Sequence, residues 1–580
     1  MEDKFDFIIV GAGTAGSVVA NRLSENFKVL LLEAGGEPNP LQSIPYLSPA
    51  LLGLPHTDWE YLANPQVNAC LAMNERRCSW PRGKSLGGTS NLNYLIYMRG
   101  HKNDYESWAN ISGDPRWRYE NVLKYFKKSE DYDGESDHYH SHGGNIRVGK
   151  SPYTGMADIF CKAAEEFGIP RADLNAEFIK GCSPLVITAK NGRRVGSYGA
   201  FLRHARHRRN LHIRKFARVT RLLFEGPENR AIGVEYNRHG LSKFVYASKE
   251  VILSAGALNS PQLLMLSGIG PREHLESFGI PVLADLPVGS NLQDHVSTLV
   301  GPFIINQPIT FNPETDLKPE ELIKFITLGE GVLASTYGQA SAYLVSEVAK
   351  SRNQSDWPDI QYFMYGTNMC DACTDRVAHS LNVRVDVLRT FYRDILGKNS
   401  FQIQTVVSRP YSRGQVRLRG RNPLLPPSMD ANYFTHVDDI KVAVEGAKRA
   451  VDLVEKSSTF RALNATLYDV SFPGCEHYKF RSEGYWECFH RQLSLTVFHV
   501  SGTCPMGKPT SPNAVVDSEL RVLETKNLRI IDASIMPHIT TGNTNAPIVM
   551  IGEIGSEMIL KSIQDSTVLE YTVKCLKCGL

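Results

Sequence analysis

Three glycines near the start of the chain have the spacing of a dinucleotide-binding turn. The motif Gly11-Ala12-Gly13-Thr14-Ala15-Gly16 follows an apolar run at residues 5–10. The first glycine permits a tight turn, the second lets backbone N–H groups approach a pyrophosphate, and the third allows close helix–strand packing. Glu33 ends the next apolar run, where its carboxylate can accept hydrogen bonds from a ribose. These residues predict a dinucleotide site and leave NAD and FAD both open.

A second glycine-rich segment, residues 83–100, bears on that choice. Gly87 and Gly88 let the backbone come close to a flat ring system, and Thr89 and Asn93 offer short polar contacts to a cofactor. An ordinary turn with capping residues would have the same composition. The residues alone therefore leave both interpretations open.

Residues 83–100, followed by Glu106, resemble the first signature of the glucose-methanol-choline (GMC) oxidoreductase family throughout its length. Residues 256–270 resemble the second signature, and the likeness continues through residues 291–295. It covers nearly the whole chain and is greatest to the arthropod branch, with FAD glucose dehydrogenase, ecdysone oxidase and the aromatic alcohol oxidases. The resemblance implies that the cofactor is FAD.

The resemblance also implies which residues hold FAD. In that family a His bonded covalently to FAD sometimes precedes the signature Asn. Leu92 stands at that position here, so we expect FAD to be bound non-covalently. Val219 is similar to the family's adenine contact through its backbone. The expected cofactor-binding residues are Gly11, Gly13, Thr14, Ala15, Gly16, Glu33, Ala34, Thr89, Asn93, Val219, Asp532, Ala533, Asn545 and Pro547.

The catalytic residues are expected near the end of the chain. Residues 498–507 are similar to the segment that carries the family's catalytic His, which falls on His499, and the second active-site position falls on Asn545. Oxidising an alcohol requires removal of the hydroxyl proton and hydride transfer from the same carbon, and a neutral imidazole is a suitable base near pH 7. The Asn545 amide can stabilise the developing alkoxide. Flavin N5 is expected to accept the hydride.

Two aromatic residues favour a small hydrophobic or aromatic alcohol as the substrate. Tyr94 matches an aromatic position at the substrate entrance of aryl-alcohol oxidases, and Phe498 is apolar beside the base. Both could also be ordinary core aromatics. A sugar of the glucose type or an ecdysteroid is the alternative substrate, with oxygen or a quinone as the electron acceptor. An FAD-containing hydroxynitrile lyase is the alternative from another class.

Other clusters that could carry chemistry are weaker. His138, His140 and His142 alternate as zinc ligands on a strand would, but their flanks indicate an exposed loop and the family needs no metal, so no metal site is expected. Cys70 and Cys78 could close a disulfide. The pairs Cys370/Cys373 and Cys575/Cys578 favour local disulfides or free thiols over a redox dithiol.

The elements that must position these residues predict an α/β fold. Residues 5–10, 15–25 and 28–33 read as strand, helix and strand, a β-α-β crossover. A strand followed by a glycine-rich turn and an apolar helix recurs after residue 525, so we expect a Rossmann-like FAD-binding domain built from discontinuous segments. A substrate domain with a mixed sheet should accompany it. The expected boundaries are 1–155, 205–300 and 515–570 for the FAD domain, and 156–204 and 301–514 for the substrate domain.

Length and charge exclude other classes. A chain of 580 residues exceeds one hydrophobic core. Lys and Arg total 64 against 61 Asp and Glu, too even a balance to favour nucleic acid or an anionic membrane. No apolar run reaches the roughly 18 residues of a transmembrane segment. The first strand begins at Phe5, which leaves no room for a signal peptide, so we expect a cytoplasmic protein, or a secreted one if this is a processed form.

Overall fold

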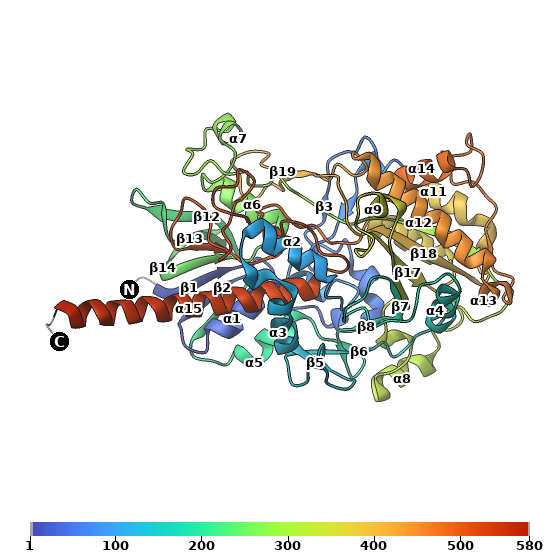
Figure 1. Ribbon diagram of the computed structural model, residues 1–580, viewed down its shortest axis with the longest axis horizontal. Coiled ribbons are helices and arrows are strands. Elements are labelled where there is room, and N and C mark those ends of the chain that lie inside the picture. Colours follow the sequence, from blue (N-terminus) through green and yellow to red (C-terminus); the bar gives the residue numbers. More distant parts are fainter. Residues whose placement is uncertain (1–3, 578–580) are drawn as a thin grey trace.

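The fold consists of two sheets that lie next to each other along the long axis of the molecule (Figure 1). The computed structural model describes residues 4–577, with side chains through residue 565. The helix α15 (Asn545–Lys577) begins near the middle of the molecule and runs along the first sheet (Figure 1). The segments expected to hold the cofactor and the catalytic residues line one cavity between the two sheets.

The first sheet has a parallel core. Its parallel strands are β11 (Leu211–Arg214), β2 (Val29–Leu32), β1 (Lys4–Val10), β14 (Leu241–Leu253) and β23 (Leu528–Ile530). The strands β12 (Ala217–Glu225) and β13 (Arg230–Arg238) extend it in antiparallel fashion. Helix α1 (Thr14–Leu23) connects β1 to β2 and packs against α15. The predicted Rossmann-like unit is therefore confirmed, and its strands come from all three segments assigned to it.

The second sheet differs from the expected mixed sheet, because every pairing between its described strands is antiparallel. Its strands are β7 (Gly181–Pro184), β15 (Val296–Ile304), β16 (Ala340–Leu344), β17 (Ile360–Tyr365), β18 (Ser400–Val407), β21 (Thr466–Leu467) and β22 (Leu495–Thr496). Three consecutive strands, β16, β17 and β18, are neighbours in chain order, which produces antiparallel pairs. The long helix α12 (Val437–Lys456) packs against this sheet.

The two faces of the second sheet have different partners. Phe363 of β17 and Val406 of β18 belong to a buried cluster with Ile96 and Met98, which lie in the second half of the signature segment, residues 83–100. Alternate residues of these strands point away from that cluster, as the twofold period of a strand requires. One face of the sheet therefore packs against the signature segment. Helix α12 also packs against the sheet, chiefly at β18.

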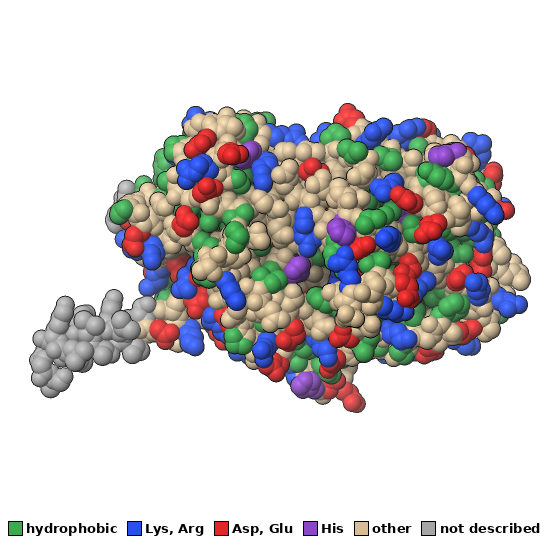
Figure 2. Space-filling view, turned by 45° about the horizontal axis from the view of Figure 1, so that its top comes forward, with side chains coloured by type: hydrophobic (Ala, Val, Ile, Leu, Met, Phe, Trp, Pro, Cys, Tyr) green, Lys and Arg blue, Asp and Glu red, His purple; other side chains and the backbone are tan. Residues whose placement is uncertain are grey.

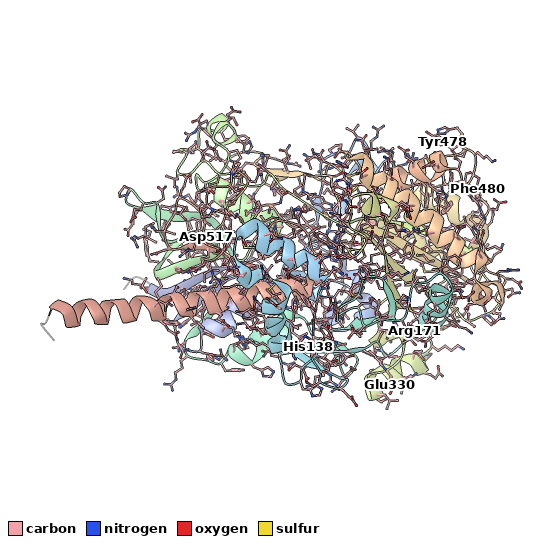
Figure 3. All side chains as sticks on the ribbon, viewed as in Figure 1. His138, Arg171, Glu330, Tyr478, Phe480 and Asp517 are labelled. Carbon is pink, nitrogen blue, oxygen red and sulfur yellow. A yellow bond between two sulfur atoms is a disulfide. The ribbon has the colours of Figure 1, made fainter. Side chains whose placement is uncertain are left out.

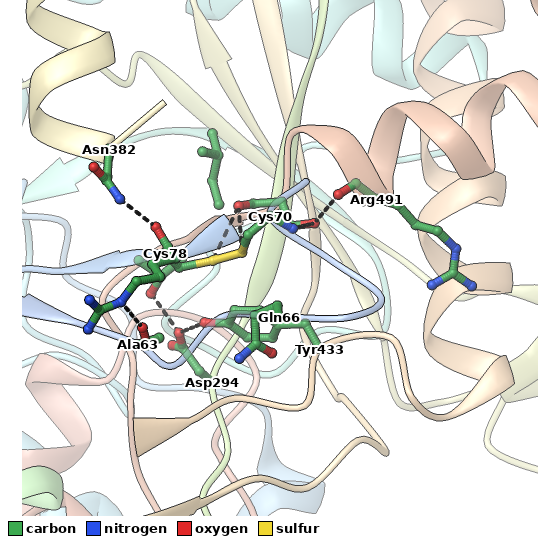
Figure 4. The surroundings of a disulfide bond; sticks show 12 residues. Ala63, Gln66, Cys70, Cys78, Asp294, Asn382, Tyr433 and Arg491 are labelled. Carbon is green, nitrogen blue, oxygen red and sulfur yellow. Dashed lines mark hydrogen bonds between the residues drawn. A yellow bond between two sulfur atoms is a disulfide. The ribbon is translucent and has the colours of Figure 1, made fainter. Parts of the chain in front are cut away.

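Four disulfide bonds occur in the described part of the chain. They join Cys70 to Cys78, Cys161 to Cys182, Cys370 to Cys373, and Cys475 to Cys488. The first, expected from the sequence, lies near Asp294 and Tyr433 (Figure 4). The side chains of Cys575 and Cys578 lie outside the described residues. Disulfides form and persist in oxidising compartments.

Replacing both Cys161 and Cys182 by Ala should lower the free energy of unfolding by about 3 kcal/mol, because the unfolded chain regains the entropy of an open loop. This bridge joins α4 (Ala157–Glu166) to β7 over a separation of 21 residues. Urea unfolding of the holoenzyme, followed by tryptophan fluorescence, measures the change. The control opens the Cys370–Cys373 bridge, whose separation is 3 residues, and should cost less. Equal losses would contradict the loop-entropy explanation.

Candidate active site

Most residues expected to contact FAD line one cavity. The members that line it are Gly11, Gly13, Thr14, Ala15, Glu33, Ala34, Thr89, Asn93, Val219, Asp532, Ala533 and Asn545. His499, Tyr94 and Phe498 line the same cavity. Two expected contacts, Gly16 and Pro547, are buried and do not line it. A Cβ on Gly16 would lie 2.0 Å from the Gly11 carbonyl oxygen, so this glycine serves helix–strand packing.

Two glycine turns form one wall of the cavity. Gly11 has a φ of +97°, and a Cβ there would lie 2.5 Å from the Ser254 carbonyl oxygen. Gly88 has a φ of +55°, and a Cβ on it would lie 2.8 Å from Cα of Gly13. The two backbones therefore touch because neither carries a side chain. This bare backbone is the surface that a pyrophosphate and a flat ring system need for close approach.

Glu33 connects the glycine turn to the end of β2. Its Oε2 accepts a hydrogen bond from the Ala12 N–H at 2.9 Å, and its Oε1 accepts one from the Gly35 N–H at 2.8 Å. Burial raises the pKa of the carboxyl, and these N–H groups oppose that rise. Each oxygen keeps a further lone pair for a ribose hydroxyl.

Two helices begin at the cavity and contact each other there. Thr14 Oγ1 at the start of α1 donates to Asn545 Oδ1 at the start of α15, at 2.9 Å. The positive ends of both helix dipoles therefore lie at the same place, where they favour a negatively charged ligand such as a pyrophosphate. Asn545 thus belongs to the cofactor end of the cavity.

The structure brings Asn543, and not Asn545, beside His499. The distance from Asn543 Nδ2 to His499 Nε2 is 3.3 Å, and Asn543 Oδ1 is buried without a hydrogen-bond partner among the described residues. The amide beside the imidazole is therefore two residues before the one expected from the sequence. Asn545 is the first residue of α15 and its side chain contacts Thr14 at the start of α1, whereas Asn543 precedes the helix and faces the imidazole. Pro547, which favours the first turn of a helix, was the available signal.

The turn that carries His499 is strained and held on both sides. Phe498 has a φ of +68°, which is costly for a residue with a large side chain. Its N–H donates to Thr496 Oγ1 at 2.8 Å, and its carbonyl accepts from Arg82 Nη1 at 2.8 Å. The His499 N–H donates to Asp294 Oδ1 at 3.0 Å. These contacts fix the position of the imidazole.

His499 is electrically neutral in this environment. The ring is buried, and burial together with nearby His295 and Arg82 holds its pKa well below the ordinary value of 6.5. Its Nδ1 lies 2.8 Å from Nδ1 of His295, and its Nε2 faces Asn543. A neutral imidazole with one nitrogen directed towards the cavity can accept a proton.

Arg82 is a site residue that the sequence analysis did not single out. It lines the cavity, and its Nε and Nη2 are buried without hydrogen-bond partners among the described residues. Buried donors of this kind are normally satisfied, so they indicate a ligand with acceptor atoms. Together with the bare glycine backbone and the two helix ends, they fit FAD. The position of Arg82 directly before the signature was the only local signal.

Aromatic and aliphatic side chains surround the end of the cavity where His499 lies. The rings of Tyr94 and Phe498 lie 6.0 Å apart between centroids, and Tyr94 is only partly buried. Leu92 packs in a small apolar cluster with Leu51, Leu52 and Phe498. No nucleophilic side chain occupies the position of the family's covalent His, so Leu92 supports non-covalent binding of FAD.

The alternating histidines do not converge on a metal. His140 is buried between Glu130 and Asp173, whose carboxylates raise its pKa to about 9 although burial opposes the charge. His142 Nε2 contacts the Gly134 carbonyl, and His138 is exposed in the lower part of the view in Figure 3. In the part of the chain that the structure describes, no three His, Cys, Asp or Glu side chains are grouped to hold a metal ion.

The surface shows no concentration of one charge on the face that Figure 2 presents. Lys and Arg side chains alternate there with Asp and Glu (Figure 2). Within the described residues, no helix is both long and apolar enough to cross a bilayer. This even distribution of positive and negative side chains is consistent with a small-molecule substrate and does not favour a polyanion.

Comparison with known proteins identifies the family. Family models described as GMC oxidoreductase match residues 5–297 and 410–552. The chain is 38% identical over 571 residues to glucose dehydrogenase (FAD, quinone) of Drosophila melanogaster, covering 96% of this chain and 87% of that protein. It is 36% identical over 582 residues to ecdysone oxidase of Bombyx mori, covering 96% of this chain and 82% of that protein.

A solved structure supports the same conclusion. Pyridoxine 4-oxidase from Mesorbium loti superposes with a TM-score of 0.78 at 29% identity, covering 95% of this chain and 98% of that one. The resemblance found in the sequence and the FAD cofactor it implies are both confirmed. The chain belongs to the GMC oxidoreductase family and is an FAD-dependent oxidoreductase that acts on CH–OH groups.

Proposed function

We propose that the chain oxidises an alcohol to a carbonyl compound with His499 as the base and Asn543 as the group that holds the reacting oxygen. The observation that carries this proposal is the pair of atoms His499 Nε2 and Asn543 Nδ2, 3.3 Å apart at the cavity. An acceptor and a donor at this spacing suit one hydroxyl group, which can donate to the first and accept from the second. This assignment replaces Asn545 with Asn543.

The proton moves from the substrate hydroxyl to Nε2 of His499, which its environment keeps neutral. The Asn543 amide donates to the same oxygen and stabilises the charge that develops on it. When bound, FAD supplies the hydride acceptor, for which flavin N5 is the expected atom. The strained turn at Phe498 and the Asp294 contact hold the imidazole in place during this step.

The surroundings of His499 favour a small hydrophobic or aromatic alcohol. Tyr94 and Phe498 flank the base, and Ile96 and Val497 line the same cavity. The acidic lining residues are Glu33 and Asp532, and both already accept hydrogen bonds from backbone N–H groups. A cationic alcohol would therefore find no free carboxylate there. Relatives named for glucose and ecdysone make a sugar or an ecdysteroid the alternative substrate.

Replacing His499 by Ala should lower the rate of anaerobic flavin reduction by about 10²–10⁴-fold, since the base is lost. Asn543→Ala should lower the same rate by about 10²–10³-fold, because one donor to the oxyanion is removed. Stopped-flow absorbance at the flavin band measures both.

Asn545→Ala is the matched control for these two variants. Its side chain contacts Thr14 and not the imidazole, so FAD affinity should fall while the rate per bound FAD stays within a few-fold of the parent. A larger rate loss in Asn545→Ala than in Asn543→Ala would restore Asn545 as the catalytic amide.

The pH dependence follows from the lowered pKa of His499. The neutral imidazole is the active base, and it persists at every pH above its pKa. The kcat/KM for alcohol oxidation should therefore stay level as the pH falls through 6.5, the ordinary His value, and decline only at more acidic pH. An acid limb centred above 6.5 that disappears in His499→Gln would show that the base is not neutral as described.

Substrate class is tested by mixing the holoenzyme anaerobically with aromatic alcohols, aliphatic alcohols, glucose and an ecdysteroid. Bleaching of the flavin should be fastest with a hydrophobic alcohol. The Tyr94→Ala substitution should weaken binding of that alcohol more than it weakens binding of glucose. Reoxidation is then followed with air and with a soluble quinone. Release of cyanide from a cyanohydrin without bleaching would favour a lyase and reject the proposed oxidation.

A further inference from the structure

A second imidazole, that of His295, lies directly behind His499. His295 is fully buried and does not line the cavity. Its Nδ1 lies 2.8 Å from Nδ1 of His499, and the two ring planes cross at 86°. Asp294, the preceding residue, holds the backbone N–H of His499. Two consecutive residues therefore fix the backbone and the ring of the same histidine.

The short distance between the two Nδ1 atoms constrains the protons. A hydrogen bond of 2.8 Å between two neutral imidazoles requires one Nδ1 to carry a hydrogen and the other to be bare. If His499 carries it, His499 Nε2 has a free lone pair. If His295 carries it, the hydrogen of His499 must be on Nε2, which then cannot accept a proton. The partner thus determines whether His499 is a base.

The contact of His499 Nε2 with the Asn543 amide favours the arrangement in which His499 Nδ1 donates to His295 Nδ1. Burial lowers the pKa of His295 to about 3 and that of His499 well below its ordinary value, so both rings are neutral. Asn543 presents an amide donor to His499 Nε2, which suits a bare nitrogen. In this arrangement the hydrogen of His295 is on Nε2, which is buried without a hydrogen-bond partner among the described residues.

We propose that His295 is a positioning residue that sets the tautomer of the base: its bare Nδ1 accepts from His499 Nδ1 and so keeps the lone pair of His499 Nε2 directed at the substrate hydroxyl. This inference rests on the proposed function of His499. His295 itself does not touch the cavity, so it acts only through the neighbouring ring.

The same contact stabilises the imidazole after proton transfer. Once the hydroxyl proton is on Nε2, the His499 ring carries a hydrogen on each nitrogen and a positive charge. No bond to His295 changes, because the Nδ1 hydrogen stays on His499 and continues to donate to His295. A charged donor to a neutral acceptor is a stronger hydrogen bond than a neutral pair, so the bond strengthens as the charge forms.

The test compares His295→Leu with His295→Asn in the FAD-loaded enzyme. Leu and Asn have nearly the same shape and leave the same space, but only Asn retains an acceptor at the position of Nδ1. Flavin reduction in His295→Leu should be slower by about 10²–10⁴-fold, the range known for a catalytic histidine in the wrong tautomer or without its supporting partner. His295→Asn should remain within about tenfold of the parent. Substrate affinity should change little in either variant.

FAD content and thermal unfolding show that both variants are folded and loaded. Equal rates in His295→Leu and His295→Asn would overturn the proposal, because only packing would then matter. The His499→Ala variant, measured in the same way, distinguishes the proposed role of His499 as the base from the proposed role of His295. If His499→Ala is slow but the two His295 variants are alike, the base assignment stands and the role of His295 fails. If His499→Ala reacts at the parent rate, the proposed function itself fails.

Discussion

The parallel register of β1, β14 and β23 is the constraint on which the site depends. Val10 pairs with Leu253, and Leu253 pairs with Ile530, so three segments far apart in the chain end at one edge of the first sheet. The residues that follow each strand line the cavity, among them Gly11, Ser254 and Asp532. A slip of one residue in this pairing would turn each lining residue to the opposite face. The cofactor site therefore exists only when the discontinuous domain is complete.

The two ends of the cavity use different physics. At the cofactor end the ligand meets backbone, because glycines remove side chains and two helices present their N-termini. At the catalytic end the chemistry depends on buried side chains whose charge states are set by their neighbours. Burial is unfavourable for a charged imidazole, and this same penalty keeps His499 neutral and able to accept a proton. The exclusion of water from this ring and the role proposed for it as a base thus have one cause.

How well a feature could be predicted from the sequence depends on how far apart in the chain its interacting residues lie. The glycine turn, Glu33 and the β-α-β unit were predictable because they depend on residues close together in the chain. The partners of Arg82 and His295 could not be predicted in the same way, because they are distant in the chain. Arg82 contacts Phe498, 416 residues away, and His295 contacts His499, 204 residues away. The expected mixed sheet is antiparallel because strand direction depends on how successive strands fold back, which local apolar patterns do not encode.

Asn543 and Asn545 show what the sequence determines and what only the tertiary structure decides. The sequence by itself determined that this segment holds amides next to a helix, that glycines form the cofactor turns, and that a histidine of the family motif is available. Steric limits on the backbone act within a few residues, so these features are local. Only the tertiary structure decided which amide faces His499, because the start of α15 and its contact with α1 set the direction of each side chain. The same packing placed the ring of His295 against that of His499.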